Sequence, residues 1–150
     1  MVRACGPGRV GIRLSPVSPV NDADPDGDFA GTYGYVVEQL KAFKLAYVHV
    51  IEGTTQGSRE MRGGFDMQEL PRSLHAARYI ANNGYDLHLA LEARRYGLAD
   101  LIAFGRLHIA NPDLVARLSS ALPLNVPDRT TFFGDGARGY TDYPFLASER

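Results

Sequence analysis

A short, almost uninterrupted apolar run constrains the fold of this chain more than any other stretch. Leu45–Ile51 reads LAYVHVI and is rich in β-branched and aromatic residues. Such a run is typical of a β-strand buried on both faces, as in a parallel sheet covered by helices. In the preceding segment, Thr32–Phe43, apolar residues recur with the period of an amphipathic helix. These residues are Val36, Val37, Leu40 and Phe43. Together the two segments predict a helix that leads into a buried strand.

The same alternation of strand and helix patterns recurs along the chain. The strand-like segments are Arg9–Leu14, Leu45–Ile51, Arg78–Ala81 and Leu101–Phe104. The helix-like segments are Thr32–Phe43, Asp66–Ala77, Asp86–Tyr96 and Pro112–Leu118. This alternation predicts an α/β fold with four parallel strands. No glycine-rich loop follows the first strand, which disfavours a dinucleotide-binding fold, so half of a (β/α) TIM barrel is the better interpretation.

Local signals place several boundaries of these elements. Ser18–Gly31 is rich in proline, aspartate and glycine and is expected to be a loop. Asp86 is a good N-cap for the helix that follows it, and Gly97 is a good stop. From Ala121 onward the sequence is irregular but contains many aromatic residues. We therefore expect a C-terminal tail that packs against another part of the protein.

Composition narrows the class of protein. A length of 150 residues suits one domain, so we expect residues 1–150 to form this barrel half without an internal boundary. The net charge of −1 gives no reason to expect binding to nucleic acid or to a membrane. The only cysteine, Cys5, excludes an internal disulfide, and the four histidines lack the spacing of a metal site. The N-terminal residues resemble no secretory signal, and we expect a cytoplasmic protein.

Polar groups follow the expected strands where each one ends. Gly105-Arg106 comes after the fourth strand, and Asn111-Pro112-Asp113 then begins a helical pattern, with Asn111 as the expected N-cap. Arg13, Glu52 and Asn83-Gly84 follow or end the other strands. In a parallel sheet all these groups lie at one edge, which is where such folds bind ligands. Backbone amides at glycine and the Arg106 guanidinium predict an anion site there, and phosphate is the natural candidate.

Several long motifs resemble the C-terminal half of the old yellow enzyme family. They are RVGIRLSP (9–16), YVHVIEG (47–53), IANNGYD (80–86), ADLIAFGRLHIANPDLVARL (99–118), PLN-PDR-TFF-G (123–134) and GYTDYPFL (139–146). The resemblance implies strands five to eight of an eight-stranded barrel. It also implies an FMN-dependent oxidoreductase that uses NAD(P)H to reduce activated alkenes, which are small molecules.

The resemblance also implies roles for individual residues. Arg13 matches the arginine that approaches the flavin ring, where a fixed cation favours the reduced, anionic flavin. Asn83-Gly84 and Gly105-Arg106 match the two strand ends that hold the FMN phosphate. Simpler roles remain open for each: Arg13 as an ion-pair partner of Glu52, Asn83-Gly84 as a tight turn, Arg106 as a surface residue, and Glu52 as a buried structural partner. No catalytic residue and no metal ligand is implied.

The matched motifs leave out the part of the family that carries the first four strands. That part contains most contacts to the flavin ring, the residue pair that grips the substrate, and the tyrosine that donates a proton. An alternative function is therefore a catalytically silent, truncated or split half-barrel that self-associates or needs its N-terminal half as a partner chain. A generic module that binds phosphate-containing ligands is a further alternative.

Overall fold

The computed structural model describes residues 1–18, 28–54, 59, 77–134 and 136–146. The chain forms two compact units, Met1–Ala103 and Phe104–Arg150, which are described separately below. Apart from Ala77, the expected helix Asp66–Ala77 lies outside the described residues, as does most of the expected loop Ser18–Gly31. Among those residues, no helix combines the length and apolarity that a membrane span requires. That residues 1–150 form one domain without an internal boundary stays a prediction.

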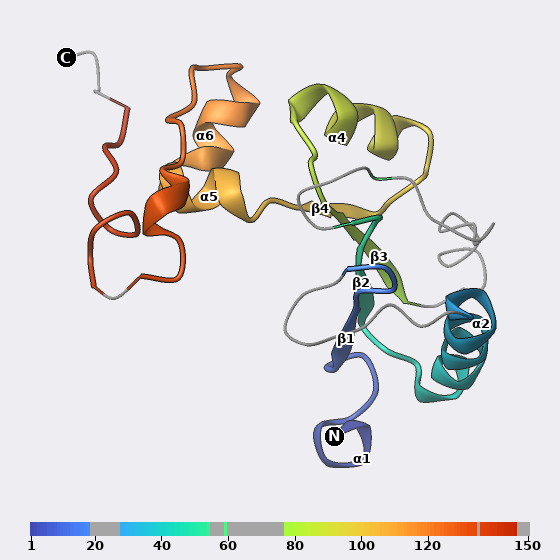
Figure 1. Cartoon of the computed structure of the whole chain (residues 1–150). Coiled ribbons are helices and arrows are strands. Elements are labelled where there is room, and N and C mark those ends of the chain that lie inside the picture. Colours follow the sequence, from blue (N-terminus) through green and yellow to red (C-terminus); the bar gives the residue numbers. More distant parts are fainter. Residues whose placement is uncertain (19–27, 55–58, 60–76, 135, 147–150) are drawn as a thin grey trace. The chain divides into compact units, whose positions relative to one another are not determined.

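The first unit contains a four-stranded parallel sheet in the order β1-β2-β3-β4 (Figure 1). Its strands are β1 (Gly11–Leu14), β2 (Tyr47–Ile51), β3 (Arg78–Asn82) and β4 (Leu101–Ala103). Arg13 lies opposite His49 in the register, and Asn82 lies opposite both Ile51 and Ala103. The four strands and their parallel order confirm the prediction from the alternating sequence pattern.

The two central strands, β2 and β3, bury the side chains of one face of the sheet and leave the other face partly exposed. Val48 and Val50 of β2 are fully buried, as are Tyr79 and Ala81 of β3, and these residues alternate along their strands. His49, which alternates with the two valines, is only half-buried. Tyr47 on the same face is exposed, whereas Ile51 at the end of that face is buried, so the prediction of burial on both faces holds only in part. The apolar run predicts that both faces of this strand can be buried, but the described residues cover the face that carries His49 only in part.

The helix α4 (Leu87–Arg95) begins and ends where the sequence predicts. The carboxylate of Asp86 accepts a hydrogen bond from the Leu89 N–H at 2.8 Å, which confirms the expected N-cap. Gly97 has φ +68°, and the next N–H, that of Leu98, bonds back to the Ala93 carbonyl at 2.8 Å. Glycine is the residue that enters this left-handed conformation at least cost, so its position ends the helix.

The first long helix begins earlier than the sequence suggests. α2 spans Phe29–Leu40, and a 3₁₀ turn, η1 (Lys41–Phe43), completes it. The expected start at Thr32 is wrong because the Asp28 carboxylate accepts from the Gly31 N–H and caps an extra turn. A short helix, α1 (Val2–Cys5), precedes the sheet and has no counterpart in the prediction.

The second unit consists of two short helices and an irregular tail. The helices are α5 (Arg106–Ala110) and α6 (Leu114–Ser119), and a 3₁₀ turn, η2 (Arg129–Thr131), follows. The predicted N-cap at Asn111 is wrong, because α6 begins only after Asp113 and Asn111 instead ends α5. The Asn111 side chain is fully buried and bonds the Asn125 backbone, with its oxygen accepting from the N–H at 2.7 Å.

The C-terminal tail is attached to α6, as expected of a tail that packs on another part of the protein, but hydrogen bonds hold it, and Phe133 and Phe145 stay exposed. Arg117 of α6 is 3% exposed and donates to the Pro144 carbonyl at 2.9 Å. The Asp113 carboxylate accepts from the Leu146 N–H at 2.8 Å, and Asn125 also donates to Pro144. These hydrogen bonds connect residues 113–125 to residues 144–146, which explains why a segment without regular structure is ordered.

Candidate functional site

The carboxyl edge of the sheet holds the residues on which the functional prediction depends. β2 ends at Ile51 and β3 ends at Asn82, and the Glu52 N–H donates to the Asn82 carbonyl at 3.0 Å. The two strand ends are thereby held side by side. The turn Asn83-Gly84 projects from this edge and is the best-defined part of the candidate site.

The Asn83-Gly84 turn has a backbone that is both unusual and well supported. Both residues have positive φ, +113° for Asn83 and +66° for Gly84. The buried Asn83 side chain donates to the carbonyls of Glu52 at 2.6 Å and Thr54 at 3.1 Å. Among the described residues, the one atom that a Cβ added at Gly84 would contact is Cδ of Arg59, at 3.9 Å. The turn is therefore fixed from one side while its backbone stays open to a ligand on the other.

A cluster of polar side chains lies beside this turn around the carboxylate of Glu52. The hydroxyls of Tyr79 and Tyr85 donate to it at 2.9 and 2.8 Å, and Arg59 donates at 3.1 Å. The Arg59 guanidinium also lies over the Tyr85 ring, 4.0 Å from its centroid. Burial, followed by the Glu52 carboxylate, raises the pKa of both tyrosines, so their hydroxyls keep their protons and act as donors.

The sequence prediction included Glu52 only as a possible structural partner and did not include the rest of this cluster. A carboxylate that directly follows a buried strand needs hydrogen-bond donors around it, and this need was the one sign in the sequence that such a cluster exists. The donors come from 7 to 33 residues away in the chain, so local patterns do not identify them.

Arg13 lies on β1 next to His49 of β2 in the sheet register. Among the residues that the structure describes, the Arg13 guanidinium has no hydrogen bond and no ion pair, and the suggested pairing with Glu52 is not formed. His49 carries a buried Nε2 without a hydrogen-bond partner in the same part of the chain. Burial, and then the nearby Arg13 charge, lower the pKa of His49 below 6.5. An uncharged imidazole thus lies beside an unpaired cation on the more open face of the sheet.

We expect His49 to stay neutral at pH values where an exposed histidine is half protonated. A lowered pKa means that the unfolded chain binds more protons, so the contribution to stability is present above pH 6.5 and is lost as pH falls through the folded pKa. Side-chain NMR of His49 checks this. Arg13→Ala should move the pKa only part of the way back, because burial is the larger cause. Titration of His49 at or above 6.5 would contradict the expectation.

Gly105 and Arg106 belong to the second unit and open α5. Gly105 is the N-cap residue and has no side-chain cap, and a Cβ placed there would find open space. In the described parts of the chain, the Arg106 guanidinium has no hydrogen bond or ion pair. The structure thus brings Arg13, Asn83 and Gly84 into the first unit and places Gly105 and Arg106 in the second. Their joint action on one ligand stays a prediction.

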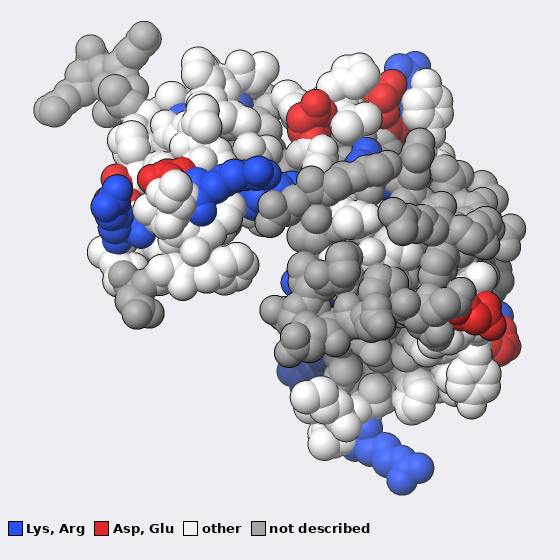
Figure 2. Space-filling view, viewed as in Figure 1, with Lys and Arg blue, Asp and Glu red and all other residues white. Residues whose placement is uncertain are grey.

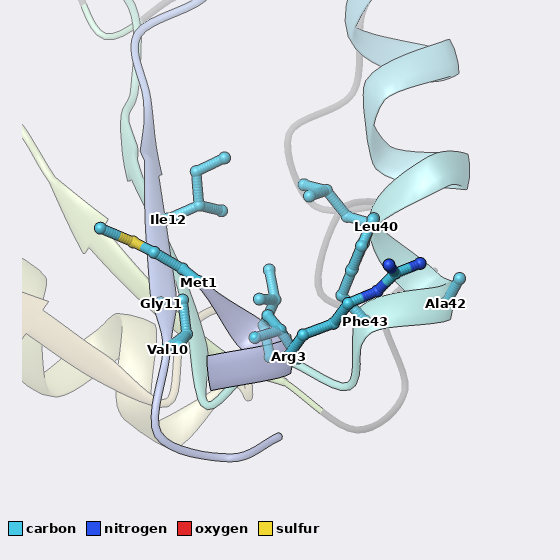
Figure 3. Close-up of a pocket in the computed structure, with 10 residues that line it drawn as sticks. Met1, Arg3, Val10, Gly11, Ile12, Leu40, Ala42 and Phe43 are labelled. Atoms are coloured by element: carbon cyan, nitrogen blue, oxygen red, sulfur yellow. The ribbon is translucent and has the colours of Figure 1, made fainter. Parts of the chain in front are cut away.

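Other surface features lie away from these strand ends. An apolar pocket of about 780 Å³ opens near the amino end of β1, lined by residues such as Val10, Ile12, Leu40 and Phe43 (Figure 3). In the view of Figure 2, basic and acidic side chains occur at several separate places. Within the described residues, no group of histidine, cysteine and acidic side chains is arranged to hold a metal ion.

Comparison with known proteins identifies the family to which these motifs belong. Residues 1–125 match the model of the NADH:flavin oxidoreductase / NADH oxidase family. The chain belongs to this family. The chain is 40% identical to the putative 12-oxophytodienoate reductase 3 of Oryza sativa subsp. japonica, over 100% of this chain and 40% of that protein. It is 34% identical to a probable flavin mononucleotide-dependent alkene reductase of Leishmania infantum, over 97% of this chain and 38% of that protein.

Solved structures of the NADH:flavin oxidoreductase family agree with the sequence relatives. The old yellow enzyme from Trypanosoma cruzi matches with a TM-score of 0.85 and 33% identity, over 97% of this chain and 37% of that one. The resemblance to the old yellow enzyme family and the half-barrel fold class are thereby confirmed. The chain spans about two-fifths of the length of the relatives that it matches.

Proposed function

We propose that this chain supplies the FMN-phosphate site of an NAD(P)H-dependent oxidoreductase that reduces activated alkenes. The observation that carries the proposal is the Asn83-Gly84 turn, which has an open backbone at positive φ and lies at the carboxyl edge of a parallel sheet. This edge is where barrels of this class bind phosphate. Family membership makes FMN the specific candidate.

The chemistry of several described residues supports a role in holding the FMN phosphate. Gly84 and Gly105 each allow close approach of a phosphate, since an added Cβ at either position would meet little or nothing. Arg106 offers a guanidinium that is free to pair with phosphate oxygens in a bidentate way. Arg13 offers a second cation on β1 that is unpaired among the described residues, beside His49, whose pKa is lowered by burial and by Arg13. The unpartnered Nε2 of His49 is a further polar atom on that side of the sheet.

When bound, FMN supplies hydride transfer from NAD(P)H to the alkene. The residues of this chain would bind and orient the cofactor. The Gly84 and Gly105 backbones and Arg106 would hold the phosphate, and Arg13 would place a positive charge near the flavin ring. We assign no proton donor and no substrate-binding residue to the described part of the chain.

We expect Arg106→Ala to weaken FMN binding by about tenfold to a hundredfold, which is the usual effect of losing a charge-assisted pair. Riboflavin lacks the phosphate, so its affinity should change little. Quenching of flavin fluorescence on titration into the 150-residue chain measures both affinities. Arg95→Ala, an exposed arginine near the end of α4, is the matched control. Equal loss of FMN and riboflavin binding in Arg106→Ala would argue against a phosphate contact.

A catalytically silent half-barrel that needs a partner chain is the alternative. It is favoured by the two strands, β1 and β4, at the edges of the sheet, and by the partly open face around His49. This alternative predicts colourless protein and no FMN binding at tens of micromolar. Size-exclusion chromatography then separates self-association from a monomer that requires another polypeptide.

A further inference from the structure

Glu52 is bonded to residues on both sides of the Asn83-Gly84 turn, through its backbone on one side and through its carboxylate on the other. On the near side, the Glu52 carbonyl accepts from the Asn83 side chain at 2.6 Å, and its N–H donates to Asn82. On the far side, Tyr85 directly follows Gly84, and its hydroxyl reaches back to Glu52 Oε2 at 2.8 Å. Gly84 is therefore held between two residues that are both anchored to Glu52.

The same carboxylate also holds a cation close to Gly84. Arg59 donates to Glu52 Oε2 at 3.1 Å and stacks on Tyr85, and its Cδ is the atom nearest to a Cβ built on Gly84. The side chain of Glu52 is only 13% exposed, and that of Arg59 is 35% exposed. The Nε of Arg59 is buried without a partner in the described residues, so this guanidinium has unused donor capacity.

A carboxylate near a phosphate site is unfavourable unless its charge is compensated. Here one guanidinium and two hydroxyl donors surround Glu52, so most of its charge is satisfied within the cluster. The arrangement thus orders the turn without leaving a bare negative charge beside it. Glu52 contacts no proposed ligand itself and would act through the groups that it holds.

We propose that Glu52 is a positioning residue. It fixes the anion-binding turn Asn83-Gly84 and orients Arg59 beside that turn. The inference rests on the proposed FMN-phosphate function and deepens it. It gives the Glu52 carboxylate a role, and it adds a stacked arginine and two tyrosines to a site that the sequence predicts from Arg13, Asn83-Gly84 and Gly105-Arg106.

The test compares Glu52→Gln with Glu92→Gln, which alters a more exposed carboxylate on α4. Glu52→Gln should weaken FMN binding by about tenfold and leave riboflavin binding within about twofold, because only phosphate contacts depend on the turn. Hydrogen exchange should become faster at residues 82–86 and stay unchanged in α4. Glu92→Gln should change neither quantity. A general loss of structure would instead affect both flavins and the whole sheet.

Two further measurements keep the inference open to refutation. Tyr85→Phe removes one donor but keeps the ring under Arg59, and it should give a smaller change in the same direction. If the unaltered chain binds no FMN, the proposed function fails, while exchange at residues 82–86 still decides whether Glu52 positions the turn. If Glu52→Gln leaves both that exchange and the ratio of FMN to riboflavin affinity unchanged, the positioning role is wrong.

Discussion

Arg117→Ala is expected to destabilise the second unit by about 3 to 5 kcal/mol, the usual cost of breaking a buried ion pair. The Arg117 side chain is 4% exposed and pairs with Asp113 at 2.6 Å. Its other donors reach the carbonyls of Pro123 at 2.8 Å and Pro144 at 2.9 Å. Alanine would open a cavity and leave the Asp113 carboxylate and the Pro123 carbonyl without this donor, whereas the Pro144 carbonyl would keep its hydrogen bond from Asn125. The tail at Pro144 would lose one of its attachments to α6, while the Leu146 N–H could still bond the Asp113 carboxylate.

Native-state hydrogen exchange of residues 104–146 measures this effect, because it reports local opening free energies. Arg129→Ala, at an exposed arginine of the same unit, should change little. Arg117→Lys keeps the charge but has one nitrogen in place of three, and it should recover only part of the loss. Protection of the Leu146 N–H that is unchanged in Arg117→Ala would show that the tail is held independently of this arginine.

The strands and one helix were predictable because their signals are local. An apolar run at Leu45–Ile51 predicts a buried strand from residue type alone, and β2 forms within it. Asp86 and Gly97 bound α4 because capping depends on residues within one turn of the helix end. The early start of α2 at Phe29 was missed because a run rich in Asp and Gly favours a loop until Asp28 is recognised as a cap.

The second unit was less predictable because its organisation depends on long-range polar contacts. Asn111 has the residue type of an N-cap, and Pro112 has that of a first helical residue. In the structure the Asn111 side chain bonds Asn125, which is 14 residues away, and this tertiary role prevails over the local preference. The same reason explains the incomplete site prediction. Glycines and arginines at strand ends are visible in the sequence, whereas the donors around Glu52 come together only in the fold.

Asn111→Leu is expected to destabilise the second unit by about 3 kcal/mol or more, although leucine has a similar size. The fully buried amide bonds three backbone groups: it donates to the Leu107 and Asn125 carbonyls and accepts from the Asn125 N–H. Leucine would leave all three without this partner in a part-buried site, and an unpaired buried group costs about 1 to 3 kcal/mol. The cost arises from the partners that remain rather than from the amide that is removed.

Site-resolved hydrogen exchange in Asn111→Leu contains its own control. The Asn125 N–H loses its acceptor and should exchange faster than expected from the general loss of stability. The Leu114 N–H bonds to the backbone carbonyl of residue 111 at 3.0 Å, which the substitution leaves in place, so it should follow only the general loss. Equal acceleration at both amides would mean that the side chain fills space and does not organise the segment. A selective effect at Asn125 would show that one buried amide holds the tail segment against α5. The backbone around Asn125 has little regular structure, so few hydrogen bonds of its own would otherwise fix it.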